Sequence, residues 1–119
     1  PAAEIPAAPS SKAPNKGAPG AQRAEDKLAQ EVAILSRAGA EIHAGRPALA
    51  LKMLEEHRRR FPSGVMAQER SAARARALCM LGRGAEAQSE LARLSKLSPN
   101  SPHEARARKA CGDALTKKN

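Results

Sequence analysis

The pattern of apolar and polar residues predicts α-helices along most of this chain. In the segment 24–44 the apolar residues return at intervals of three, four or seven positions: Leu28, Val32, Leu35 and Ile42. Side chains spaced in this way lie on one face of a helix, and the charged residues between them lie on the other face. Later segments show similar spacing. We therefore expect five helices, at about 24–44, 47–61, 65–81, 84–98 and 101–115.

Glycine and proline residues mark the ends of these helices. Gly45 follows the last apolar residue of the first helix, and Pro47 stands where the first turn of the second helix begins. The Pro-Ser-Gly sequence at 62–64 ends the second helix, because a residue that precedes proline is pushed out of the helical region. The Ser-Pro-His-Glu sequence at 101–104 is a capping box that starts the fifth helix. Turns this short force neighbouring helices to pack antiparallel.

The first 23 residues have the composition of a linker. Five prolines and six alanines fall within the first 20 positions, and prolines at this density prevent both helix and sheet. Because there is little apolar surface to bury, we expect residues 1–23 to be a disordered Ala/Pro-rich linker and residues 24–119 to be the folded domain. The alternative for the Pro-Ala-Ala-Pro sequence at 6–9 is a proline-rich ligand for a partner domain.

Identical residues recur at one constant offset, which indicates an internal repeat. Each of four residues is followed 37 positions later by the same residue, namely Gly45 by Gly82, Ala50 by Ala87, Leu54 by Leu91 and Pro62 by Pro99. Ala38, Ala75 and Gly112 extend the series with a small residue at the same interval. The repeat predicts an all-α fold of two helical hairpins and a closing helix. The alternative is an alanine-rich helical bundle whose turns match by chance.

With these residues the sequence resembles the tetratricopeptide repeat (TPR) family over about residues 30–115. That family also ends its helical hairpin with a glycine-led turn, an A-x-x-x-F segment and a proline. Two departures are that Leu, Ile and Ala hold its aromatic positions, and that the period is 37 residues where the family has about 34. The Arg-Arg-Phe-Pro-Ser-Gly sequence at 59–64 precedes an Ala- and Arg-rich helix. This combination is similar to envelope-associated TPR proteins of Gram-negative bacteria, such as outer-membrane assembly lipoproteins and the periplasmic partner of the Tol–Pal system.

The resemblance also implies where a partner would bind. In the TPR family the first helices of successive hairpins line a groove that holds a peptide or a partner helix. The exposed residues of the matching helices here are Glu69, Arg70, Arg74, Arg76, Arg106 and Lys109. If the basic members converge, they form a cationic strip suited to acidic side chains or a terminal carboxylate. The family's carboxylate clamp is not matched, since Leu35 and Gly39 stand at its positions. The alternative is a solvated surface without a specific ligand.

The two cysteines, Cys79 and Cys111, fall on the first helices of adjacent units, which the resemblance places side by side. Their positions within the two helices do not coincide, so the distance that a disulfide requires is not assured. Two states therefore stay open. One is a disulfide that joins the closing helix to the rest of the domain, and the other is a pair of buried thiols.

The formal net charge of +9 and the isoelectric point near 10.4 suggest nucleic acid or an acidic surface as a partner. A single Phe, without Trp or Tyr, argues against single-strand binding, which needs aromatic stacking faces. His43, His57 and His103 lack the spacing of metal ligands, and we expect them at exposed positions or helix ends, with no metal site. No nucleophile, base and orienting group combine in the sequence, so we expect neither catalytic residues nor a cofactor.

The leading hypothesis is a non-enzymatic protein–protein interaction scaffold that binds an acidic peptide or protein in the bacterial cell envelope. No apolar run approaches the roughly 20 residues that span a bilayer. We expect the chain to be a piece of a longer or processed protein, tethered to a membrane upstream of Pro1 and located in the periplasm. The alternatives are an extracytoplasmic domain of an anti-sigma-like membrane regulator, a basic nucleic-acid-binding accessory module, a purely structural or oligomerisation module, and a cytoplasmic location.

Overall fold

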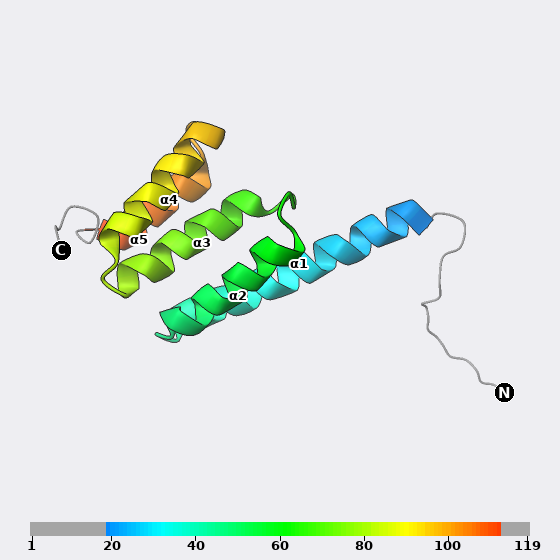
Figure 1. Ribbon diagram of the computed structural model, residues 1–119, viewed down its shortest axis with the longest axis horizontal. Helices are drawn as coiled ribbons and strands as arrows, with labels where there is room; N and C mark the ends of the chain where they lie inside the picture. Colours follow the sequence, from blue (N-terminus) through cyan, green and yellow to red (C-terminus); the bar gives the residue numbers. More distant parts are fainter. Residues whose placement is uncertain (1–18, 113–119) are drawn as a thin grey trace. The chain divides into compact units, whose positions relative to one another are not determined.

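The computed structural model describes residues 19–112, which form five α-helices and no strand. The helices are α1 (Pro19–His43), α2 (Pro47–Arg60), α3 (Ala67–Met80), α4 (Gly84–Leu97) and α5 (Pro102–Cys111) (Figure 1). The chain divides into two units, residues 1–30 and residues 31–119. In the first unit, residues 23–30 are helical and exposed. The packing described below concerns the second unit, in which the all-α class expected from the sequence is confirmed.

Three helix boundaries lie more than one residue away from the sequence-based expectation. Helix α1 begins at Pro19, so residues 19–23 are helical and not part of a linker, while residues 1–18 lie outside the described part. Proline suits the first turn of a helix, because the N–H groups there have no acceptor within the helix and the missing N–H of proline costs no hydrogen bond. Helix α3 begins at Ala67 and not at about Val65. Helix α5 ends at Cys111, and its expected continuation to 115 lies outside the described residues.

The backbone reproduces the 37-residue repeat at the turn inside each hairpin. Gly45 and Gly82 have φ angles of 82° and 75°, a left-handed conformation that favours glycine. The same pair of hydrogen bonds closes both helices: Gly45 N–H to Ile42 O and Arg46 N–H to Glu41 O, then Gly82 N–H to Cys79 O and Arg83 N–H to Leu78 O. This is the Schellman arrangement, which satisfies carbonyls that the end of a helix leaves free.

The repeat continues into the turn that follows each hairpin. Phe61 N–H donates to His57 O at 2.8 Å, and 37 positions later Ser98 N–H donates to Leu94 O at 2.8 Å. Gly64 N–H then donates to Phe61 O, as Ser101 N–H donates to Ser98 O. The turns of the two helical hairpins thus form the same hydrogen bonds at the 37-residue offset, and α5 follows the second hairpin. Gly112, the third small residue of the predicted series, instead ends α5 with a φ of 55°.

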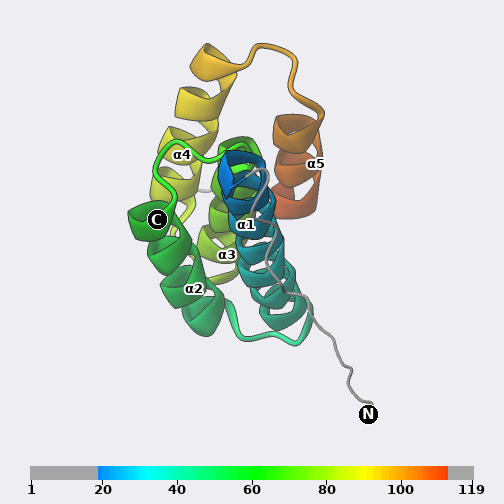
Figure 2. The same ribbon diagram turned by 90° about the vertical axis from the view of Figure 1, so that its right-hand side faces the viewer.

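Two apolar clusters form the core, one for each hairpin, and α3 contributes to both. The first cluster consists of Ala38, Ile42, Ala50, Leu54 and Ala77. The second consists of Ala72, Ala75, Leu78, Ala87, Leu91, Leu94 and Ala107. Helix α3 packs against α2, α4 and α5, and Figure 2 shows α2 and α4 on one side of it and α5 on the other. Alanine side chains allow this close approach, and Leu54, Leu78, Leu91 and Leu94 are the largest fully buried apolar side chains.

We expect Leu91→Ala to lower the free energy of unfolding by about 2–5 kcal/mol, because it removes a fully buried side chain and leaves a cavity between α3 and α4. Chemical denaturation followed by circular dichroism measures this change. Leu97→Ala is the matched control on the same helix, since Leu97 is 79% exposed and should cost less than about 0.5 kcal/mol. Equal losses in the two variants would contradict the assignment of the core.

Candidate functional site

The structure divides the six predicted partner-binding residues between opposite sides of α3. Glu69 and Arg76 face α5, where they line one pocket together with Arg106. Arg70 and Arg74 face α2 and α4 and line a different pocket. Successive residues of a helix are separated by about 100°, so Arg74 and Arg76 point in nearly opposite directions. The predicted convergence of Arg70 and Arg74 with Arg106 and Lys109 is therefore wrong, and Lys109 is an exposed residue of α5.

Two connected pockets lie along the side formed by the first helices, and we call them together the Arg76 groove. A cavity of about 240 Å³ between α3 and α5 is lined by Glu69, Ala72, Ala73, Arg76, His103, Arg106 and Ala107. A cavity of about 450 Å³ is lined by Ile42, His43, Arg76, Cys79, Met80, Ala110 and Cys111. Arg76 belongs to both. The first cavity has more charged groups among its lining residues, and the second adds Ile42, Met80 and the two cysteines beside His43 and Arg76.

The charged end of the Arg76 groove contains a small polar network. His103 Nε2 lies 3.3 Å from Glu69 Oε2, and Arg106 Nη2 lies 3.2 Å from His103 Nδ1. The carboxylate of Glu69 is thus already engaged with an imidazole. Arg76 is half-buried, and no carboxylate within residues 19–112 lies in ion-pair distance of it. A cation without a partner at the junction of two cavities is a ready contact for an incoming carboxylate.

A disulfide joins Cys79 of α3 to Cys111 of α5, which decides between the two states that the sequence left open. The Cα atoms are 5.6 Å apart, within the range that the bond requires. Both cysteines line the larger cavity of the Arg76 groove. The bond therefore fixes the separation of the two helices that form the sides of the groove.

We expect the double variant Cys79→Ala/Cys111→Ala to lose about 2–4 kcal/mol of unfolding free energy, because the disulfide closes a loop of 32 residues in the unfolded chain. Guanidinium denaturation measures the loss. A reducing agent should destabilise the wild type by a similar amount and leave the double variant unchanged. A wild type that is equally stable in its oxidised and reduced forms would contradict this expectation.

A buried polar cluster, which the sequence reading missed, joins α1, α2 and α3. His57 is 0% exposed, although we expected the histidines at exposed or terminal positions. Its Nδ1 accepts a hydrogen bond from Arg70 Nη1 at 3.2 Å, which leaves the ring proton on Nε2. Glu31 Oε1 lies 3.2 Å from that Nε2, in ion-pair range but without the alignment of a hydrogen bond. Arg70 also donates to the carbonyl of Phe61 at 3.1 Å.

The carboxylate of Glu31 fills a space that a glycine leaves open. A Cβ atom added at Gly64 would overlap this carboxylate, with its Cδ at 2.6 Å. The same carboxylate accepts a hydrogen bond from Met66 N–H at 3.4 Å. Glu31 thereby fastens α1 to the turn between α2 and α3. Because the cluster is closed to solvent at His57, its arrangement serves to hold the helices together rather than to transfer protons to a substrate.

The repeat offset would have predicted this cluster. His57 stands 37 positions before Leu94, which is one of the core residues of the second hairpin. Glu31 and Gly64 likewise correspond to Gln68 and Ser101, and Ser101 Oγ donates to Gln68 Oε1 at 3.1 Å. Burial of His57 follows from its place in the repeat, although its residue type suggests the surface.

Burial lowers the pKa of His57 below its ordinary value, because the imidazolium is the charged form. The positive charge of Arg70 lowers this pKa further, and that of Arg60 does so to a smaller extent. The carboxylate of Glu31 acts in the opposite direction without reversing the shift. The ring is therefore neutral at neutral pH, which agrees with its acceptance of a hydrogen bond from Arg70.

We expect the protein to lose stability as the pH falls below about 6.5, the usual pKa of histidine. Below that pH the unfolded chain binds a proton at His57 more readily than the folded chain does. The stability that the neutral His57 contributes is therefore fully present above the ordinary pKa and is lost as the pH falls below it. Urea denaturation between about pH 7.5 and 5.5 measures the slope, which His57→Gln should reduce. His43→Gln, at an exposed site, should retain the wild-type slope. Equal slopes in all three proteins would contradict the assignment.

Comparison of this chain with protein-family models, curated proteins and solved structures finds no significant match. Within residues 19–112, no helix combines the length and the apolar character that crossing a membrane requires. The function is therefore inferred from the geometry of the chain itself.

Proposed function

We propose that this chain is a non-enzymatic, TPR-like scaffold that binds a peptide segment of another protein in the Arg76 groove. The observation that carries the proposal is the pair of cavities, about 240 and 450 Å³, that meet at an arginine without a carboxylate partner within residues 19–112. The smaller cavity offers Arg76, Arg106, His103 and Glu69, and the larger one offers apolar side chains beside Arg76 and His43. A groove with both properties suits a peptide that presents an acidic group beside an apolar side chain.

The arrangement of the helices supports the TPR-like assignment. The two hairpins share their turn hydrogen bonds at the 37-residue offset. The larger cavity draws residues from α1, α3 and α5, which are the first helices of the successive units. The second helices, α2 and α4, lie together on the other side of α3 (Figure 2). A peptide in the groove would therefore contact first helices, as it does in the family that the sequence resembles.

The chemistry of the ligand follows from the side chains of the groove. Arg76 and Arg106 would bind an acidic side chain or a terminal carboxylate through charge-assisted hydrogen bonds. Ile42 and Met80 would take the neighbouring apolar side chain, and Met80 is 48% exposed before any partner binds. Methionine adapts its shape readily, which suits a surface that accepts more than one apolar residue.

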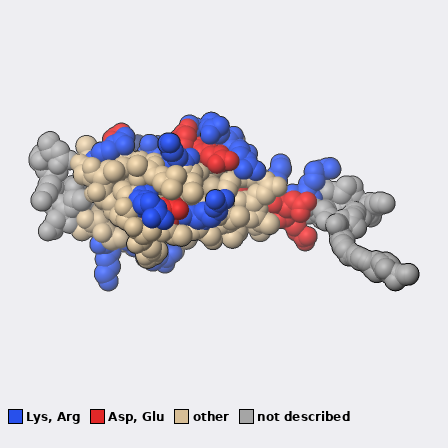
Figure 3. All heavy atoms as spheres, turned by 90° about the horizontal axis from the view of Figure 1, so that it is seen from below, with Lys and Arg blue, Asp and Glu red and all other residues tan. Residues whose placement is uncertain are grey.

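Nucleic acid is a less suitable ligand, because much of the basic charge is already paired. Four surface arginines contact carboxylates on their own helices or at the helix start: Arg58 with Glu55, Arg60 with Glu56, Arg83 with Glu86 and Arg108 with Glu104. On the face drawn in Figure 3, basic side chains form separate clusters with acidic ones among them, and uncharged surface lies between. A continuous basic strip would serve phosphate contacts better.

The cell envelope is the compartment that we propose for this scaffold. The disulfide between Cys79 and Cys111 supports it, because such bonds persist in oxidising compartments such as the periplasm and are rare in the cytosol. Cysteine oxidation thus favours a periplasmic over a cytoplasmic location.

A selection from a random peptide library displayed on phage tests the proposal. We expect the selected peptides to share an acidic residue near an apolar one, and the double variant Arg76→Glu/Arg106→Glu to reduce their affinity at least tenfold, because it reverses both charges of the groove. Fluorescence polarisation of a labelled peptide measures the affinity.

The control is Arg59→Glu/Lys96→Glu, which changes the net charge equally at exposed positions on α2 and α4. These two changes should leave the peptide affinity within about twofold of the wild-type value, because dissolved salt screens the interaction of distant surface charges with the groove. Peptides without a shared pattern, or equal losses in the two double variants, would overturn the assignment of the groove.

A further inference from the structure

We propose that a second pocket, formed by four arginines between α2, α3 and α4, binds a phosphoryl group. This pocket lies on the side of α3 away from the Arg76 groove, and the inference does not depend on the proposed peptide binding. The ligand chemistry is a tetrahedral dianion, carried either by a lipid headgroup or by a soluble phosphate compound. The pocket is called the arginine pocket below.

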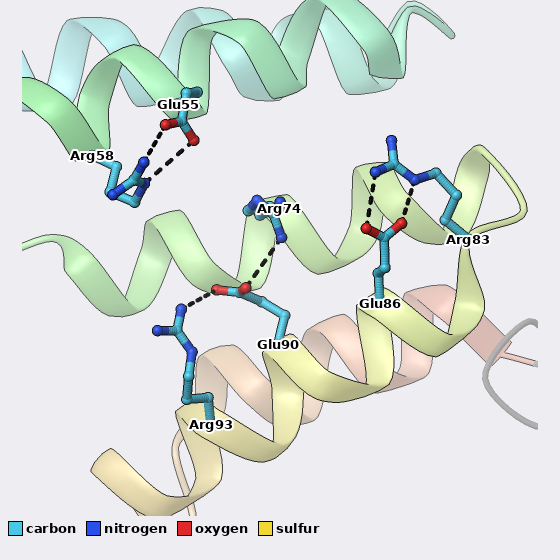
Figure 4. A network of polar contacts seen from close by, with 7 residues as sticks. All are labelled: Glu55, Arg58, Arg74, Arg83, Glu86, Glu90 and Arg93. Atoms are coloured by element: carbon cyan, nitrogen blue, oxygen red, sulfur yellow. Dashed lines mark hydrogen bonds and ion pairs between the residues drawn. The ribbon is translucent and has the colours of Figure 1, made fainter.

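The arginine pocket is a defined cavity of about 310 Å³. Each of the three helices supplies charged side chains to it, and the lining residues are Leu54, Glu55, Arg58, Arg70, Arg74, Glu90 and Arg93. Figure 4 shows Arg74 and Arg93 reaching one carboxylate from two different helices, with Arg58 on the helix opposite. Side chains from three helices that point into one cavity can surround a single small anion.

The charges that line the arginine pocket do not balance. Four arginines face two glutamates, a formal excess of two positive charges. Arg58 pairs with Glu55 on its own helix, while Arg74 and Arg93 share the carboxylate of Glu90. Arg70 lies in ion-pair distance of no carboxylate among residues 19–112, since its contacts are the ring of His57 and the carbonyl of Phe61. A dianion would neutralise this excess.

Glu90 shows that these arginines already hold an oxyanion. Its two oxygens are bound separately, Oε1 by Arg74 Nη1 at 3.2 Å and Oε2 by Arg93 Nη2 at 3.3 Å. The Glu90 side chain is only 9% exposed, while the guanidinium groups that hold it are more open to solvent, Arg93 most of all. Planar guanidinium groups bind phosphate with the same forked geometry that they use for carboxylate. An incoming phosphoryl oxygen therefore finds donors that are already oriented toward negative charge.

Arg70 places part of the excess positive charge at a fixed position in the wall of the arginine pocket. Arg70 is partly buried, and burial lowers its pKa, with the nearby charge of Arg58 lowering it further. Arginine nevertheless stays protonated in proteins. Its contacts with His57 and Phe61 hold the guanidinium in place, so the cation is fixed at the wall of the pocket without a counter-charge. Binding of an anion would relieve this repulsion.

Titration with inorganic phosphate, followed by phosphorus NMR, tests the proposal on the full chain. We expect saturable broadening or shift of the phosphate signal with the wild type, and at least a tenfold weaker response with Arg93→Gln or Arg58→Gln, because each removes a charged donor. Arg59→Gln, next to Arg58 on α2, and Lys96→Gln, on the same helix as Arg93, remove the same charge outside the pocket. Both controls should bind as the wild type does.

Removal of the internal carboxylate should have the opposite effect. Glu90→Gln frees Arg74 and Arg93 from their present anion, so we expect it to bind phosphate more tightly than the wild type by at least severalfold. Glu56→Gln removes the same negative charge outside the arginine pocket, so a gain with Glu90→Gln alone cannot come from the general rise in net positive charge. Circular dichroism of each variant verifies that the helices are retained.

Vesicles distinguish the two sources of the phosphoryl group. If sedimentation with phosphatidic acid vesicles, but not with phosphatidylcholine vesicles, depends on Arg58 and Arg93, the group is carried by a lipid. If free phosphate binds in dependence on these two arginines and neither kind of vesicle is bound, the group is carried by a soluble compound. The proposal is overturned if the wild type gives neither a phosphate response nor arginine-dependent vesicle binding. Equal effects of Arg58→Gln and Arg59→Gln would overturn it as well.

Discussion

The close packing of α3 against its neighbours is the constraint on which the rest of the structure depends. Helix α3 contributes to both apolar clusters and contacts α2, α4 and α5. Alanine at its buried positions makes this approach feasible: Ala72, Ala75 and Ala77. Because alanine buries little apolar area, at about 25 cal/mol per Å², the core depends on a few leucines and on covalent support. The disulfide from Cys79 provides that support at Cys111, the final residue of α5.

The same constraint determines where charge can be placed. The buried positions of α3 hold three alanines and Leu78, and its charged side chains extend between the packed neighbours. The side chains of Arg70 and Arg74 extend toward α2 and α4, and that of Arg76 extends toward α5. Two sites of different chemistry therefore lie back to back on one helix of 14 residues. The Arg76 groove and the arginine pocket can both form on this helix because buried alanines lie between them.

The sequence was sufficient to predict the features that follow from the 37-residue repeat and from local residue patterns. Helix order and the glycine turns are as predicted, since apolar spacing and turn residues act locally. Arg76 and Arg106 line one pocket, but Arg70 and Arg74 do not join them, because a difference of two positions on a helix nearly reverses the direction of a side chain. The sequence left the state of the two cysteines undecided, because the Cα separation of 5.6 Å depends on how closely α3 and α5 approach. His57 was missed because residue type was weighed without its counterpart, Leu94.

The positions at which the two repeats differ are the positions that give this chain its distinctive chemistry. Leu94 needs no polar partner, but His57 at the equivalent place must satisfy two ring nitrogens inside the core. Arg70 supplies the donor for one of them, while its own counterpart 37 positions later is Ala107, a core residue of the second hairpin. The guanidinium that stabilises the buried imidazole is thus the same one that leaves an unpaired charge in the wall of the arginine pocket. The histidine at the position equivalent to Leu94 is thus accompanied by the contacts of Glu31 and Arg70 in the buried cluster, and Arg70 contributes one of the two excess positive charges of the arginine pocket.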